Sequence, residues 1–99
     1  MSKRRSRLEI ILSILSAIRG GKDKPTNIMY AVNLSWKPTQ RILSDLVEQG
    51  LLKERIASGK GLSKRRYAIT ERGINVLDYF EKAKEILPKD VYSAHAVSS

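Results

Sequence analysis

The chain contains no cysteine and a single histidine among its 99 residues. The absence of cysteine excludes disulfide bonds, thiol catalysis, and zinc or iron–sulfur centres held by cysteine. His95 has no pair of carboxylates near it in the sequence, so we expect neither a metal site nor a catalytic base there. The sequence also lacks a nucleophile–base pair, paired acids and a phosphate loop. We therefore predict no enzymatic activity, no cofactor, no metal and no small-molecule substrate.

Long apolar runs are absent as well. No stretch approaches the ~20 apolar residues that a membrane-spanning helix needs. Glu9 interrupts the first apolar region and no small-residue cleavage site follows, so a signal peptide is not expected. The hydrophobic fraction is 41%, which is enough for one compact core in a chain of this length. We expect one soluble, cytoplasmic domain that does not act at a membrane.

Acidic residues are scarce where basic residues are abundant. The formal net charge is +9, and residues 1–70 contain fifteen Lys or Arg against five Asp or Glu. Residues 71–99 contain four basic and five acidic residues, so they are nearly balanced. A surplus concentrated in this way is typical of proteins with a polyanionic partner, most often nucleic acid. Many small basic proteins, however, are charged only for solubility.

Residues 34–52 have the signals of a complete amphipathic helix. Ser35 is a favourable N-cap residue whose hydroxyl can accept a backbone N–H, and Pro38 falls in the first turn, which tolerates proline. Gly50 can supply a left-handed residue at the C-terminal end. The apolar face consists of Ile42, Leu43, Leu46 and Val47. The opposite face carries Lys37, Gln40, Arg41 and Ser44. Hydrogen-bonding side chains in this half of a helix are typical of a recognition helix in the major groove.

A shorter helix precedes this one. Pro25 can open it at its first position, and Asn33 can close it in left-handed geometry. A short helix, a brief turn and a longer helix form the helix-turn-helix pattern. We expect Tyr30 to lie in the core or an interface. Trp36 either packs partly against the short helix or exposes its ring to the sugar-phosphate backbone.

The first helix is predicted from its capping signals. Ser6 and Glu9 fit a capping box, and Gly20 and Gly21 end the helix. Its main apolar stripe is Leu8, Ile11, Leu12, Leu15 and Ile18, with Ile10 and Ile14 beside it. So broad an apolar face indicates burial on more than one side, in the core or against a second subunit.

Two candidate strands, residues 51–57 and 66–70, flank a glycine-rich and lysine-rich segment. A β-hairpin after a helix-turn-helix is the wing of the winged-helix fold. Four cations lie at or beside its tip, where they could reach DNA backbone or a minor groove: Lys60, Lys64, Arg65 and Arg66. A basic arm at the N-terminus could do the same with Lys3, Arg4 and Arg5, or remain a solvated terminus.

A last helix is expected between Thr70, which can cap it, and Pro88, which stops it. Ile74, Leu77 and Phe80 can complete the core, yet apolar residues remain beyond that stripe. A small domain rarely exposes so much apolar surface. We therefore assign helix-to-helix dimerisation to Val76, Tyr79, Phe80, Ala83 and Ile86. Scattered exposed apolar residues at a ragged helix end are the alternative.

These elements predict an α+β fold that is mainly α: a winged helix-turn-helix with a two-stranded wing and a C-terminal dimerisation helix. We expect a flexible basic arm at residues 1–7 and the winged domain at 8–70. The last helix spans 71–87, and a loose tail spans 88–99.

The stretch from Leu34 to Leu52 resembles the reading helix of winged helix-turn-helix regulators. Residues 67–73, YAITERG, look like the junction between strand and last helix in those proteins. Residues 28–35 and 8–11 are similar to small archaeal winged-helix proteins, including the 10a-type DNA-binding proteins of thermophiles. The resemblance covers residues 3–87. It implies a nucleoid-associated homodimer that binds double-stranded DNA as a chromatin protein or transcription regulator. Pro88 departs from it, since the 10a-type proteins have a longer last helix that forms a coiled coil.

Other functions remain open from the residues alone. Winged helices also serve as protein–protein interaction modules, although such a module has no need for cations on both helix and wing. RNA binding is less favoured, because no strand carries the aromatic residues on which RNA bases stack.

Overall fold

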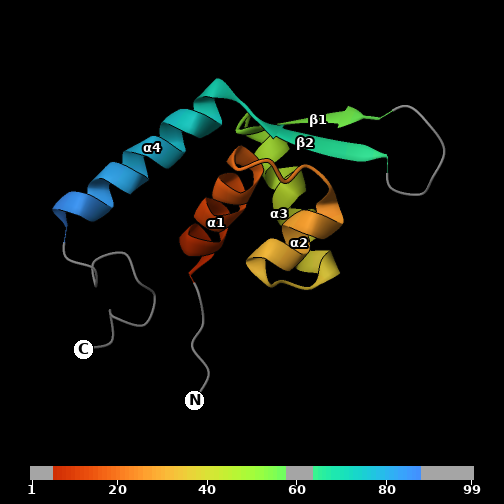
Figure 1. Cartoon of the computed structure of the whole chain (residues 1–99), viewed down its shortest axis with the longest axis horizontal. Coiled ribbons are helices and arrows are strands. Elements are labelled where there is room, and N and C mark those ends of the chain that lie inside the picture. The colour runs from red at the N-terminus through yellow and green to blue at the C-terminus, as the bar shows by residue number, and fades with distance from the viewer. Residues whose placement is uncertain (1–5, 58–63, 88–99) are drawn as a thin grey trace, which may run out of the picture.

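Four helices and a two-stranded antiparallel hairpin make up the described part of the chain, residues 6–57 and 64–87 of a computed structural model (Figure 1). In order these are α1 Arg7–Arg19, α2 Pro25–Val32, α3 Trp36–Glu48, β1 Leu52–Ile56, β2 Arg65–Ile69 and α4 Glu71–Ile86. This confirms the mainly α winged-helix architecture. Lys3, Arg4, Arg5, Lys60 and His95 lie outside the described residues. Within the described ranges, no helix is long and apolar enough to cross a membrane.

The capping box predicted for α1 is present. The Glu9 N–H donates to Ser6 Oγ at 3.0 Å, and the Ser6 N–H donates to Glu9 Oε1 at 2.8 Å. The predicted stripe was partly wrong, because Ile14 is fully buried whereas Leu8 and Ile11 are only half-buried. α1 contacts α2, α4 and β2, so it is covered from several sides. Its fully buried side chains therefore include Ile14, which the sequence placed beside the main stripe.

The turn between α2 and α3 has the expected left-handed residue. Asn33 has a φ of 59°, and the Leu34 N–H donates to the Met29 carbonyl at 3.2 Å. Ser35 is the N-cap of α3, but the prediction that its hydroxyl caps the helix was wrong. A capping hydroxyl bonds the second or third N–H of a helix, and the third residue here is Pro38, which has none.

Tyr30 is not in the core, so of its two expected locations only an interface with a partner remains. Its side chain is 75% exposed, whereas Ile28 and Val32 of the same helix are buried. Residues 28 and 32 are one turn apart and share the face of α2 that meets the core. Residue 30 lies halfway round that turn, so its side chain points outward.

The hairpin is tied to the helices at its root. Leu52 pairs with Ile69 and Glu54 with Tyr67 in the antiparallel register. The Tyr67 N–H also donates to the Asp23 carbonyl at 2.9 Å. Residues 21–24, which connect α1 to α2, do not form a strand, but Asp23 forms this backbone hydrogen bond with β2.

A compact junction joins the end of α3 to the start of α4. The Thr70 hydroxyl lies 2.7 Å from the Gly50 carbonyl and 3.0 Å from the Leu51 carbonyl, and it accepts the Gly73 N–H at 3.0 Å. The Thr70 N–H donates to the Leu51 carbonyl at 3.2 Å. Gly73 sits so close to Leu51 that no side chain fits between them. The junction therefore fixes the start of α4 relative to the end of α3.

Replacing Gly73 tests this close approach. A Cβ at residue 73 would overlap the Leu51 carbonyl oxygen and lie 2.7 Å from Ile69 Cγ1. We expect Gly73→Ala to lower the free energy of unfolding by about 1–3 kcal/mol, measured by urea denaturation, because backbone must shift. Gly20→Ala is the matched control, since its Cβ would meet only atoms 3.4–3.5 Å away. Equal stability of the two variants would contradict the tight junction.

Candidate nucleic-acid interface

α3 separates an apolar face from a polar one, as predicted. Ile42, Leu43 and Leu46 are buried against the other elements. Thr39 is buried beside them, and its hydroxyl is satisfied by donating to the Ser35 carbonyl at 2.8 Å. The polar side chains assigned to DNA are all exposed on the other side: Lys37, Gln40, Arg41 and Ser44. These four side chains can therefore donate and accept hydrogen bonds at the surface of the protein.

Trp36 opens α3 next to these polar residues. Its side chain is 41% exposed, which corresponds to partial packing with one part of the ring open to solvent. Tyr30 of α2 is also a large aromatic residue with an exposed side chain. Their chemistry permits contacts with sugar or base, and Trp36 precedes the exposed Gln40 by one helical turn.

The hairpin places its predicted cations on two different faces. Arg65 lies on the face that carries Glu54 and Tyr67, and its Nε is 3.2 Å from Glu54 Oε2. Burial, together with the nearby Glu54 carboxylate, raises the pKa of the Tyr67 hydroxyl, so that hydroxyl stays neutral around pH 7. Arg65 is thus paired with an acid on this face of the wing.

Lys64 and Arg66 lie on the opposite face, which also carries Lys53 and Arg55. The sequence interpretation missed Lys53 and Arg55 as candidate site residues because it considered only cations near the tip. The alternation of side chains along residues 51–57 could have identified these two residues. It places residues 53 and 55 on the opposite face of the strand from the apolar Leu52.

Two ion pairs connect α1 to its neighbours. Arg7 Nη2 lies 2.9 Å from Asp45 Oδ2 of α3, and Arg19 Nη1 lies 2.7 Å from Asp78 Oδ1 of α4. All four side chains are substantially exposed, so each pair contributes no more than about 1 kcal/mol. The Arg7 pair places the start of α1, and with it the end of the basic arm, beside α3.

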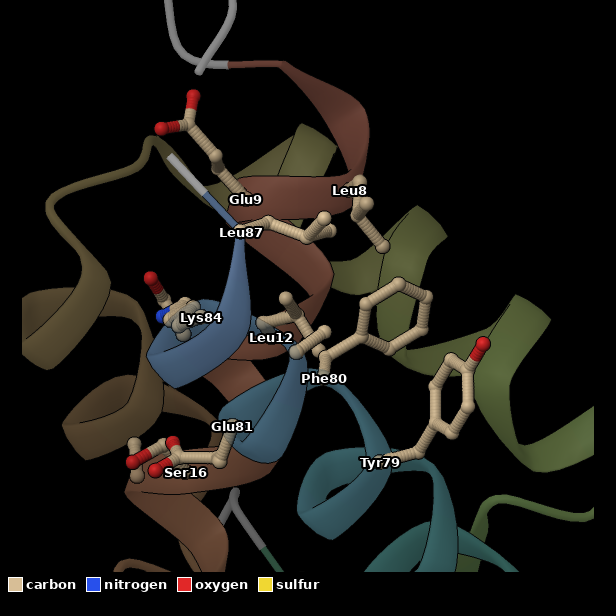
Figure 2. A pocket seen from close by; sticks show the side chains of 12 residues that line it. Leu8, Glu9, Leu12, Ser16, Tyr79, Phe80, Glu81, Lys84 and Leu87 are labelled. Atoms are coloured by element: carbon tan, nitrogen blue, oxygen red, sulfur yellow. The ribbon is translucent and has the colours of Figure 1, made fainter. Parts of the chain in front are cut away.

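α1 and α4 enclose a groove of about 650 Å³, which we call the α1–α4 groove (Figure 2). Its apolar lining includes Leu8 and Leu12 of α1 and Phe80 of α4. Tyr79 packs edge-on against Phe80 with 5.2 Å between ring centroids.

The five residues assigned to dimerisation divide into two groups. Val76, Phe80 and Ala83 are half-buried, and the first two pack against the core of their own chain. Tyr79 is 69% exposed and Ile86 is 78% exposed. The part of this assignment that is free to contact a second chain is therefore Tyr79 and Ile86, next to the groove.

The described residues contain no group of three or more His, Cys, Asp or Glu side chains that could hold a metal ion. The site is thus a surface of cations and hydrogen-bonding groups over α3 and the hairpin. Such a surface can bind phosphate and base edges.

Solved structures share this fold. A protein of Streptococcus mutans superposes with a TM-score of 0.73 and 23% identity, over 87% of this chain and 85% of that one. The FabT protein of Streptococcus pneumoniae, solved in complex with DNA, superposes with a TM-score of 0.65 and 15% identity. That match covers 94% of this chain and 70% of FabT. At sequence identities of 23% and 15%, the similarity to these two structures shows a shared fold only.

Sequence comparison identifies the family. An uncharacterized protein of Methanocaldococcus jannaschii is 30% identical over 84 residues, which are 85% of this chain and 78% of that protein. A family model described as "Winged helix-turn-helix" matches residues 4–87. The chain belongs to the winged helix-turn-helix family.

Proposed function

We propose that this protein binds duplex DNA through the exposed face of α3, with cations of the hairpin on the flanking phosphates. The observation that carries the proposal is the division of α3. Its apolar side chains are buried, while Lys37, Gln40, Arg41 and Ser44 are all exposed on one short stretch of helix. The FabT complex supports the proposal, because a protein of the same fold was solved with DNA.

The exposed side chains suit different parts of a duplex. Gln40 can hydrogen-bond the adenine edge in a bidentate manner, and Arg41 can do the same with guanine or hold a phosphate. Lys37 lies at the start of α3, where a phosphate is the expected partner because the helix dipole also favours an anion there. Ser44, two turns further along, can donate to either a base or the backbone.

The cations outside the described residues extend this proposal. Lys60 belongs to the segment between the strands, and Lys3, Arg4 and Arg5 precede α1. Arg7, the last residue of the expected basic arm, is paired with Asp45 of α3. We assign these four residues to phosphate or minor-groove contacts, together with Lys64, Arg65 and Arg66.

We also propose that the protein acts as a homodimer joined through α4. Tyr79 and Ile86 are exposed next to the apolar α1–α4 groove, and a second copy could fill that groove while covering both residues. A dimer would present two reading helices to one duplex, as symmetric regulators do.

Salt dependence tests DNA binding. If a dimer neutralises about 6–10 phosphates, its affinity for a duplex falls by roughly 10³–10⁵ between 50 and 200 mM salt. Replacing both Lys37 and Arg41 with alanine should weaken binding and reduce the slope of log affinity against log salt by about 2 per chain. The matched control is Lys22→Ala with Lys82→Ala, which removes two exposed lysines elsewhere. A flat titration would contradict DNA binding and favour a protein-interaction module.

Molar mass in solution tests the dimer. Tyr79→Glu combined with Ile86→Glu should convert the dimer to a monomer, because burying unpaired carboxylates at an apolar contact is unfavourable. Light scattering after gel filtration measures the change. Tyr30→Glu is the control, since Tyr30 is equally exposed but lies on α2. A wild-type protein with the mass of one chain would contradict the dimer.

Sequence preference separates a chromatin protein from a transcription regulator. We expect the affinity ratio between the DNA upstream of the protein's own coding region and random DNA to exceed about 10³ for a regulator. A ratio near one would indicate an architectural protein. Competition binding at a single fixed salt concentration measures this ratio, since both affinities vary with salt.

A further inference from the structure

Glu54 is the one acidic residue of the two strands. β1 and β2 together contain four basic residues, Lys53, Arg55, Arg65 and Arg66. A surface that serves only to attract phosphate has no use for a carboxylate among its cations, because the carboxylate repels phosphate. The groups that Glu54 contacts therefore decide whether it opposes DNA binding or assists it.

Glu54 contacts Arg65 of the opposite strand. Arg65 Nε lies 3.2 Å from Glu54 Oε2. Glu54 pairs with Tyr67, and Arg65 lies two residues before Tyr67 on β2, so Glu54 and Arg65 are diagonal neighbours on one face. Long side chains reach each other across such a diagonal. The side chain of Glu54 is 30% exposed and that of Arg65 is 58% exposed, so the guanidinium is the more open member of the pair.

Tyr67 lies next to both members of this pair. It is buried, and its N–H donates to the Asp23 carbonyl at 2.9 Å. Burial raises the pKa of its hydroxyl, the Glu54 carboxylate raises that pKa further, and the Arg65 guanidinium lowers it. Both charged groups thus act on the same hydroxyl. Because Tyr67 is anchored by its buried side chain and by its backbone, it gives the pair a fixed support.

The ion pair leaves part of the Arg65 guanidinium available to a second anion. A guanidinium has five N–H donors in a rigid planar fork, and Nε carries only one of them. The other four belong to Nη1 and Nη2, which can bind phosphate oxygens in a bidentate manner. One arginine can therefore hold a carboxylate at Nε and a phosphate at its Nη groups. The carboxylate then sets the plane of the fork in the free protein.

Orienting the Arg65 side chain in advance favours binding. A long side chain that becomes immobilised only on binding loses conformational entropy, which lowers affinity by roughly two- to tenfold. A side chain that is already held in the free protein avoids most of this loss. The charge of Glu54 has the opposite effect, because removal of a carboxylate near DNA raises affinity. The sign of the change in affinity when Glu54 is replaced therefore distinguishes the two effects.

We propose that Glu54 and Tyr67 are positioning residues for DNA binding, which hold the Arg65 guanidinium in the orientation that binds a backbone phosphate. This inference rests on the proposed function, because Arg65 contacts the same duplex as the exposed face of α3. It gives the acid of the hairpin a role in binding, and it makes Arg65 a contact that is oriented before the duplex arrives.

Replacement of Glu54 by glutamine tests the inference, because Glu54→Gln removes the charge and keeps the size of the side chain. Affinity for a labelled duplex of 20 base pairs is measured by fluorescence anisotropy across a salt series. We expect affinity to fall by roughly two- to tenfold. The slope of log affinity against log salt should decrease by up to about 1 per chain, as for the loss of one phosphate contact.

Glu48→Gln is the matched control. Glu48 is an exposed acid at the end of α3, and none of the ion pairs among the described residues includes it. Its replacement removes the same charge without disturbing Arg65. Glu48→Gln should therefore leave the affinity unchanged or raise it, in contrast to Glu54→Gln.

Dependence on Arg65 separates positioning from stabilisation of the hairpin. In protein that carries Arg65→Ala, Glu54→Gln should no longer lower the affinity, because no guanidinium remains to be oriented. Tyr67→Phe removes the hydroxyl and keeps the buried ring, and it should lower the affinity only when Arg65 is present. This second variant keeps the inference testable if Glu54→Gln does not fold. A loss of affinity that persists without Arg65 would indicate a structural role and would refute positioning.

Two further outcomes overturn the inference. Tighter binding by Glu54→Gln than by the wild type would show that Glu54 competes with phosphate for Arg65. Equal affinity of Arg65→Ala and the wild type would show that Arg65 makes no contact with the duplex. In both cases the wild-type protein still binds DNA, so the proposed function stands. Wild-type protein that binds no duplex would instead contradict the proposed function itself.

Discussion

Burial of one face of α3 is the constraint on which the rest of the structure depends. Leu43 and Leu46 are almost completely removed from solvent, so the helix cannot rotate about its axis without exposing them. Burial of a leucine side chain stabilises a protein by about 1.5–3 kcal/mol. The same constraint determines which side chains remain outside. The exposed position of Gln40 and Arg41 is thus a consequence of core packing rather than of any contact they make.

The other elements hold this helix in place and define its surroundings. α1 is buried from several sides, and its ends are linked to α3 and α4 by exposed ion pairs. The junction of Thr70, Gly73 and Leu51 fixes the start of α4 against the end of α3 through short hydrogen bonds. The start of α4 is therefore held close to the end of α3.

Packing against the core also determines how the charged residues of the hairpin are distributed between its two faces. A two-stranded ribbon has two faces, and one of them must cover the core. The face that carries Leu52 and Tyr67 also carries Arg65, which is exposed and pairs with Glu54. The opposite face carries Lys53, Arg55, Lys64 and Arg66, and the first three of these are exposed.

The amino-acid sequence by itself determined the elements, because their signals are local. The capping box of Ser6 and Glu9, the left-handed Asn33 and the Thr70 cap are each specified within a few residues. The periodicity of α3 likewise identified its polar face. Tertiary structure alone decided which part of α1 is buried and that Tyr30 is exposed. It also decided that Thr39 rather than Ser35 bonds at the start of α3. Cross-strand register placed Lys53 and Arg55 with Lys64 and Arg66, since residues so distant in sequence meet only when the strands pair.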